Sequence, residues 1–245
     1  MSDPRIDSYQ WARGREAMLR WGPERGPKVV VALPLFEEAN RCRALAATMC
    51  GALATRGIGS LLPDLPGQGE SLVPLQDCSI LDIADGLDGA IKADWEAGTP
   101  VYGVAIRSGA LLDKLALLNG RWHFAPQRGP DLLRELKRIK QATTGHRLAD
   151  GDLWIHDPDL PEDAPVEIAG NLVSPGLLTA FGIYEPWTAA DGGPVRTVRL
   201  LSDPAPADHR VEGAPLWRRA EPDNNLALAL VLADDIAEWI ARCAA

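Results

Sequence analysis

The segment Ala105-Ile106-Arg107-Ser108-Gly109 has the spacing of a turn that presents a catalytic nucleophile, but it lacks the nucleophile. Such a turn reads small–x–nucleophile–x–Gly, with an apolar strand before it and a helix after it. With Ala105 and Gly109 as the small residues, Arg107 stands at the tip, and Ser108 comes one residue too late. We call Ala105–Gly109 the elbow. Its pattern predicts a turn that points Arg107 into a pocket, and it argues against ordinary nucleophilic catalysis.

Nucleophilic catalysis of this kind also needs a histidine base and an acid that orients it, in the chain order nucleophile, acid, histidine. Asp203, after an apolar run, fits the acid position. The histidine is expected within a Gly-x-x-His context, and the matching segment Gly213-Ala214-Pro215-Leu216-Trp217 places Leu216 there. Two of the three catalytic positions therefore hold side chains that cannot perform the reaction.

A second catalytic set remains open. His209 lies between Asp203 and the last strand, and it could serve Ser108 as a base if its loop were displaced. Against this, Ser108 is expected to face the helix side of the turn, and His209 fits a solvated loop. Because a base must lie within hydrogen-bond reach of its nucleophile, a separation beyond about 6 Å would exclude this set.

Arg107 has two interpretations. At the tip it would lie beside the N-terminus of the following helix, where free N–H groups and the helix dipole attract anions, so that a carboxylate or phosphate could bind there. Alternatively, Arg107 pairs with Glu37 or Glu38 and plugs the pocket. Both interpretations predict a contact between Arg107 and the loop that carries these acids. The candidate ligand-binding residues are Arg107, Phe36, Glu37, Glu38, Asn40, Leu216 and Trp217.

Composition limits the function classes. The chain has 245 residues, of which 46% are hydrophobic and 24% charged, enough for one large core. Its net charge of −9 argues against nucleic acid as a partner. Four cysteines without a CxxC pair or metal-like spacing predict buried thiols in a reducing compartment, with no metal and no cofactor. We see no targeting segment and no apolar run that could span a bilayer, and we expect a cytoplasmic protein.

The surrounding elements alternate between apolar strands and helices, which predicts a mostly parallel sheet covered on both faces. The expected strands are 28–33, 58–62, 100–106 and 195–201, and the expected helices are 39–55, one that begins at Ser79, 109–118, 131–143 and 225–242. Gly145–Pro165 is polar and reads as a surface excursion. We expect a single domain over residues 1–245, with residues 127–190 as a cap insertion.

Several motifs resemble known proteins. Asp64-Leu65-Pro66-Gly67-Gln68-Gly69-Glu70-Ser71 resembles the D-x-x-G-x-G-x-S loop of α/β-hydrolases. Four further runs resemble the group called exosortase A system-associated hydrolase 2, namely Leu33–Asn40, Ala105–Leu111 with the elbow, Val166–Pro175 and Gly213–Trp217. The resemblance covers most of residues 28–240. It implies an α/β-hydrolase fold in a bacterial protein linked to exopolysaccharide and protein-sorting loci. The stretch from Ser202 to Val211 departs from the group, since it is too short for the usual penultimate helix.

Three functional hypotheses follow. We favour a degenerate hydrolase that binds a small anionic or acyl ligand, or a partner protein, at the remodelled pocket. The alternative is an ester or thioester hydrolase that uses Ser108, His209 and Asp203, with help from Glu37 or Glu38. The third is a structural subunit that assists an active paralogue. A homo-oligomer is left open.

Overall fold

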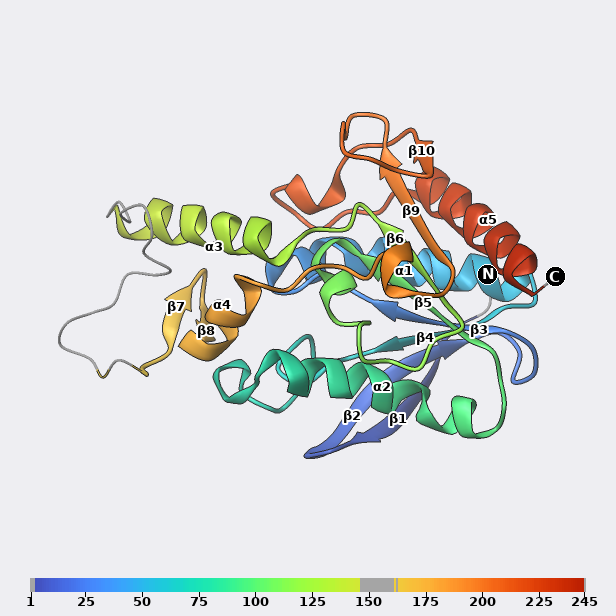
Figure 1. The fold of residues 1–245 in the computed structure, drawn as a ribbon, viewed down its shortest axis with the longest axis horizontal. Helices are drawn as coiled ribbons and strands as arrows, with labels where there is room; N and C mark the ends of the chain where they lie inside the picture. The colour runs from blue at the N-terminus through green and yellow to red at the C-terminus, as the bar shows by residue number, and fades with distance from the viewer. Residues whose placement is uncertain (1–2, 146–160, 162, 245) are drawn as a thin grey trace.

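The computed structural model describes residues 3–145, 161 and 163–244. Its centre is an eight-stranded sheet of order β1-β2-β4-β3-β5-β6-β9-β10 (Figure 1). The strands are β1 (Arg5–Trp11), β2 (Gly14–Trp21), β3 (Lys28–Ala32), β4 (Gly59–Pro63), β5 (Val101–Ile106), β6 (Gly120–Phe124), β9 (Val195–Leu200) and β10 (His209–Val211). The pairs β1–β2 and β2–β4 are antiparallel and all other pairs are parallel, so the expected mostly parallel sheet is confirmed.

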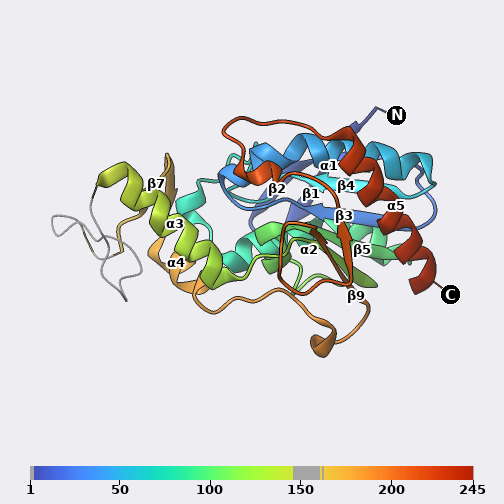
Figure 2. The ribbon, with the colours of Figure 1, turned by 90° about the horizontal axis from the view of Figure 1, so that it is seen from above.

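Helices cover both faces of the sheet (Figure 2). Every residue of β3, β4, β5 and β6 is buried, as expected for parallel strands that are covered on two sides. Helices α1 (Glu37–Thr55) and α5 (Leu226–Cys243) lie on one face, and α2 (Ile80–Glu96) lies on the other. A capping box between Ser79 and Asp82 starts α2 where the sequence predicts its beginning. This scaffold fixes the carboxyl ends of β3 and β5, from which the site is built.

Four described elements between β6 and β9 form a lobe beyond the carboxyl ends of the central strands (Figure 1). They are α3 (Gly129–Thr144), β7 (Val166–Ile168), β8 (Asn171–Val173) and α4 (Pro175–Phe181). Phe181 packs edge-to-face on Phe36, with ring centroids 5.9 Å apart, which joins the lobe to the loop after β3. Most of the polar stretch 145–165 lies outside the described residues, so its expected surface position is not described.

The segment after the elbow does not form the helix that its sequence predicts. Instead of a helix over residues 109–118, the structure has a short 3-10 helix, η2 (Arg107–Leu111), followed by irregular chain. The Arg121 guanidinium donates to the carbonyl oxygens of Asp113 and Ala116, which ties this irregular chain to β6. The buried Asp113 carboxylate also pairs with His123 Nε2 at 2.7 Å. The macrodipole of a long helix is therefore missing at the elbow.

Other differences are smaller. The sequence did not predict the N-terminal hairpin β1–β2. Residues 201–208 connect β9 to β10 without a helix, which agrees with the expectation that this stretch is too short for one. Three further 3-10 segments are η1 (Leu75–Asp77), η3 (Ala189–Asp191) and η4 (Leu216–Arg218). All four cysteines are free, and burial raises the pKa of the Cys50 thiol to about 12. Among the described residues, no helix combines the length and apolar character needed to cross a bilayer.

Candidate functional site

The elbow keeps the backbone of a nucleophile turn. Arg107 has a φ of 54°, a left-handed conformation that is rare for a residue with a side chain. A Cβ on Gly109 would lie 2.3 Å from the Ala32 carbonyl oxygen, so only glycine lets the turn pack this closely on the end of β3. The tip lies between the carboxyl ends of β3 and β5, where the strand order reverses and where α/β proteins commonly bind ligands. The structure thus has the tight turn, with Arg107 at its tip, that the spacing of Ala105 and Gly109 predicts.

The side chain at the tip is held by Glu38 of α1. Arg107 Nε and Nη2 each donate to a carboxylate oxygen of Glu38 at 3.1 Å, in the bidentate arrangement that suits a guanidinium. Nη2 also lies 3.4 Å from a carboxylate oxygen of Glu135 on α3, and Cζ lies 5.0 Å from the centre of the Trp217 ring. The Arg107 and Glu38 side chains are only 15% and 12% exposed. Arg107 therefore has the arrangement of the second interpretation, in which it pairs with Glu38 and fills the pocket at the elbow.

Burial raises the pKa of the Glu38 carboxyl above its ordinary value, although the charge and hydrogen bonds of Arg107 oppose that rise. The contact with Glu38 is the one that both interpretations of Arg107 require. Glu37 and Asn40 are exposed, and neither side chain has a hydrogen bond or ion pair within the described part of the chain. Phe36 contacts Phe181. A role for Phe36, Glu37 and Asn40 in ligand binding stays a prediction.

Two backbone donors in the loop after β3 are occupied. The Ser108 hydroxyl is fully buried and accepts a hydrogen bond of 2.9 Å from the Leu35 N–H. The Phe36 N–H donates to the Gln68 side-chain oxygen at 3.1 Å. In acyl transfer, an N–H of the corresponding loop stabilises the oxyanion of the tetrahedral intermediate. Here both N–H groups are bound to side chains of the protein itself.

The alternative catalytic residues have separate partners. Asp203 accepts from Arg199 Nη1 at 2.6 Å and from the Ala205 N–H at 3.0 Å. Burial tends to raise the pKa of Asp203, but these hydrogen bonds and the charge of Arg199 lower it overall. His209 is exposed and begins β10 at the edge of the sheet. Over the described ranges, no hydrogen bond or ion pair joins Ser108, Asp203 and His209 to one another.

Leu216, at the position of a catalytic histidine, is 1% exposed and belongs to the core between the sheet and helices α1 and α5. Two contacts hold its neighbour Trp217 in place. Arg41 donates to its carbonyl oxygen at 2.9 Å, and its ring packs edge-to-face on Phe124 at 5.8 Å. The base position is thus part of the hydrophobic core, and Trp217 supplies a rigid wall beside Arg107.

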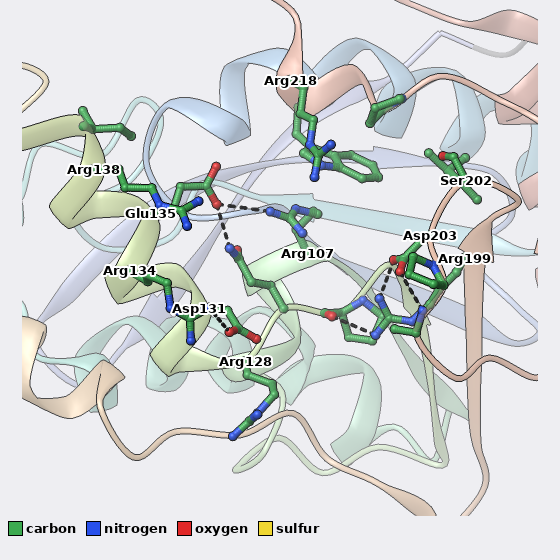
Figure 3. Close-up of a pocket in the computed structure, with 18 of the residues that line it drawn as sticks. Arg107, Arg128, Asp131, Arg134, Glu135, Arg138, Arg199, Ser202, Asp203 and Arg218 are labelled. Atoms are coloured by element: carbon green, nitrogen blue, oxygen red, sulfur yellow. Dashed lines mark hydrogen bonds and ion pairs between the residues drawn. The ribbon is translucent and has the colours of Figure 1, made fainter. Parts of the chain in front are cut away.

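A cavity of about 790 Å³ opens beside the elbow, between α3, the loop after β9 and η4 (Figure 3). We call it the arginine cavity because arginine is its commonest lining residue. Its charged lining consists of Arg107, Arg128, Arg134, Arg138, Arg199 and Arg218 with Asp131, Glu135 and Asp203. An excess of positive charge in a chain whose net charge is −9 marks this wall as a place for anions.

Most of these arginines are already paired. Arg134 binds Asp131, Arg199 binds Asp203, and Arg128 turns away from the elbow to bind Glu185 (Figure 3). Arg138 of α3 and Arg218 of η4 differ, since their guanidinium groups have no hydrogen bond or ion pair with any residue that the structure describes. Both extend into the space around Arg107 and Glu135 (Figure 3). The cavity can therefore offer two unneutralised guanidinium groups to an anion.

Sequence reasoning missed Gln127, Glu135, Arg138 and Arg218. Only the i, i+4 spacing of Arg134 and Arg138 gave a signal, because it places both on one side of α3. Trp187 lies outside the cavity lining, where its ring centre is 4.4 Å from Cζ of the Arg121 guanidinium.

Comparisons with known proteins identify the fold. The sequence matches no protein-family model and no curated protein sequence. Solved structures that resemble the chain include the epoxide hydrolase VrEH1 from Vigna radiata, with 15% identity, a TM-score of 0.58 and coverage of 99% of each chain. Est1E from Butyrivibrio proteoclasticus is 13% identical, with a TM-score of 0.58 and coverage of 97% of this chain and 98% of that one. A soluble variant of monoglyceride lipase from Saccharomyces cerevisiae is 11% identical, with a TM-score of 0.58 and coverage of 99% of this chain and 96% of that one. The chain has a single-domain α/β-hydrolase fold, and the comparisons do not extend to the exosortase-associated group.

Proposed function

We propose that this α/β-hydrolase-fold protein binds a small anionic ligand in the arginine cavity and does not hydrolyse esters at its elbow. The observation that carries the proposal is a contrast between arginines of one cavity. Arg107 is neutralised by Glu38, whereas Arg138 and Arg218 have no hydrogen bond or ion pair with the described residues. The cavity volume lies in the range of small-molecule sites. Apolar lining from Ile139, Leu200 and Trp217 suits the ring or short acyl part of such a ligand.

Binding of simple anions tests the proposal. Inorganic phosphate and succinate at millimolar concentrations should raise the melting temperature of the wild type, because a ligand that binds only the folded state stabilises it. The double variant Arg138→Gln/Arg218→Gln should lose roughly tenfold in affinity, as expected for the removal of charge-assisted hydrogen bonds. Arg242→Gln is the matched control, because Arg242 lies near the end of α5 and does not line the cavity. The absence of stabilisation, or equal stabilisation of the double variant, would overturn the proposal.

The alternative function is an ester or thioester hydrolase that uses Ser108, His209 and Asp203. It has less support, because the Ser108 hydroxyl is bound to the Leu35 N–H and Asp203 is bound to Arg199. A panel of activated esters and thioesters decides between the two functions, with wild type, Ser108→Ala and His209→Ala compared. Turnover by the wild type that disappears in both variants would establish the alternative.

We extend the proposal to a bacterial cytoplasmic protein with a role linked to exopolysaccharide. This extension rests on the motifs that resemble exosortase A system-associated hydrolase 2 and on the four free thiols, of which Cys42, Cys50 and Cys78 are buried. A protein partner, or a second copy of the chain, belongs to the same extension. Light scattering of the purified protein with and without phosphate measures whether copies associate.

A further inference from the structure

Glu135 on α3 brings a carboxylate oxygen without a partner to the arginine cavity. Both hydrogen bonds that it accepts end on Oε2, from Gln127 Nε2 at 2.8 Å and from Arg107 Nη2 at 3.4 Å (Figure 3). Its other oxygen, Oε1, has no hydrogen bond or ion pair within residues 3–145, 161 and 163–244. Oε1 is accessible to solvent, and the side chain that carries it lines the cavity and is 43% exposed. A bound molecule can therefore reach this oxygen.

The charged groups at the elbow carry one negative charge in excess. Arg107 is already neutralised by its two hydrogen bonds to Glu38, so the charge of Glu135 is not balanced by it. Arg138 lies three residues further along α3, where a helical ion pair is possible, but it forms none with Glu135 in the described structure. The cavity thus holds unbalanced charges of both signs, the guanidinium groups of Arg138 and Arg218 and the carboxylate of Glu135.

We propose that the ligand is an anion that also carries an ammonium group, in the class of acidic amino acids and aminoalkyl phosphates. Its acidic group binds Arg138 and Arg218, and its ammonium group donates to Glu135 Oε1. This inference rests on the proposed function and adds a second, positively charged group to the ligand. An anion without an amine would bring its own negative charge close to the unbalanced Glu135 carboxylate, and like charges repel each other. The ammonium group offsets that repulsion with a charge-assisted hydrogen bond.

Matched pairs of ligands test the assignment by isothermal titration calorimetry. Glutamate and glutarate share a chain of the same length with a carboxylate at each end, and they differ in the amino group. Aminoethyl phosphate and ethyl phosphate form the corresponding phosphate pair. We expect the wild type to bind the aminated member of at least one pair about tenfold more tightly, the effect of one charge-assisted hydrogen bond. The pair that shows the preference identifies the acidic group as a carboxylate or a phosphate.

The variant Glu135→Gln keeps the size of the side chain and removes its charge, so the preference for the aminated member should fall to about one. The affinity for the aminated member should decrease, because its partner is lost, and the affinity for the other member should increase, because the repulsion is lost. A general loss of packing would weaken both members of a pair alike. Glu238→Gln on α5 removes the same charge at a side chain that does not line the cavity, and it should keep the wild-type preference.

Circular dichroism verifies that both variants are folded. If the wild type prefers the aminated member of neither pair, or if its preference survives in Glu135→Gln, this inference is overturned and the proposed function is left intact. Failure of all four compounds to bind would overturn both.

Discussion

Arg107 and Glu38 are joined by two hydrogen bonds of 3.1 Å across the elbow, at the place where a hydrolase would hold its nucleophile. The pair connects the tip after β5 to the first turn of α1, and the Trp217 ring covers the guanidinium. Since both side chains are mostly buried, each charge depends on the other to offset the loss of water. The pair therefore closes the catalytic position, and removal of either partner would leave the other charge buried alone.

Arg107→Ala should lower the free energy of unfolding by roughly 2–4 kcal/mol, because it leaves the Glu38 carboxylate buried without a partner. Urea denaturation of wild type and variant measures the difference. Arg128→Ala is the control. Its ion pair with Glu185 is exposed, and exposed pairs contribute at most about 1 kcal/mol. Equal effects of the two substitutions would contradict a stabilising role for the Arg107–Glu38 pair.

Arg107→Ser should not create an esterase. A serine at the tip would have no histidine, because Leu216 fills that position, and the Leu35 and Phe36 N–H groups are already bound to Ser108 and Gln68. We expect hydrolysis of p-nitrophenyl acetate at the uncatalysed rate, measured by absorbance, for wild type, Arg107→Ser and Arg107→Ala. A burst of p-nitrophenol in proportion to the Arg107→Ser protein, absent from Arg107→Ala, would contradict this reading of the elbow.

Glu135→Gln should tighten the binding of inorganic phosphate by about fivefold. Glu135 brings a negative charge into the arginine cavity and holds Arg107 Nη2 at 3.4 Å, so it competes with an incoming anion. Calorimetry measures the affinity, and Glu238→Gln on α5 controls for the change in total charge. If the two variants bind phosphate equally well, Glu135 does not act as a local competitor.

Glu16→Gln should stabilise the protein at alkaline pH but not at acidic pH. Burial raises the pKa of Glu16 above its ordinary value of 4.5, and the hydrogen bond from Ser71 offsets only part of that rise. A carboxyl with a raised pKa in the folded state loses stability as the pH increases from its unfolded pKa through its folded pKa. Glutamine keeps an acceptor for Ser71 and avoids the buried charge.

The melting temperature of Glu16→Gln should therefore exceed that of the wild type by a few degrees near pH 8, at ~2–4 °C for each kcal/mol. Near pH 4 both proteins carry a neutral side chain, and the difference should be small. Scanning calorimetry at the two pH values makes the comparison. An equal shift at both would show that packing, and not ionisation, causes it.

The sequence predicted the central fold because its signals there are local. Continuous apolar runs predict buried strands, the Ser79 cap predicts the start of α2, and Gly109 predicts a close turn. The helix expected after Gly109 does not form, because contacts with a part of the chain that is distant in sequence determine the conformation of this segment. Arg121, from the later strand β6, binds the carbonyl oxygens of Asp113 and Ala116, and these contacts compete with a helical conformation of the segment. Local propensity could not reveal that competition.

The sequence by itself determined that the elbow has no nucleophile and that the histidine position holds leucine, because residue type alone excludes the chemistry. The tertiary structure decided what replaces that chemistry. In the structure Glu38 is the partner of Arg107, Leu216 lies in the core, and Arg138 and Arg218 line the cavity without a hydrogen bond or ion pair to any described residue. These residues come from four separate segments, and only folding sets which charges are neutralised and which face an open space. The ligand site is therefore a property of the fold.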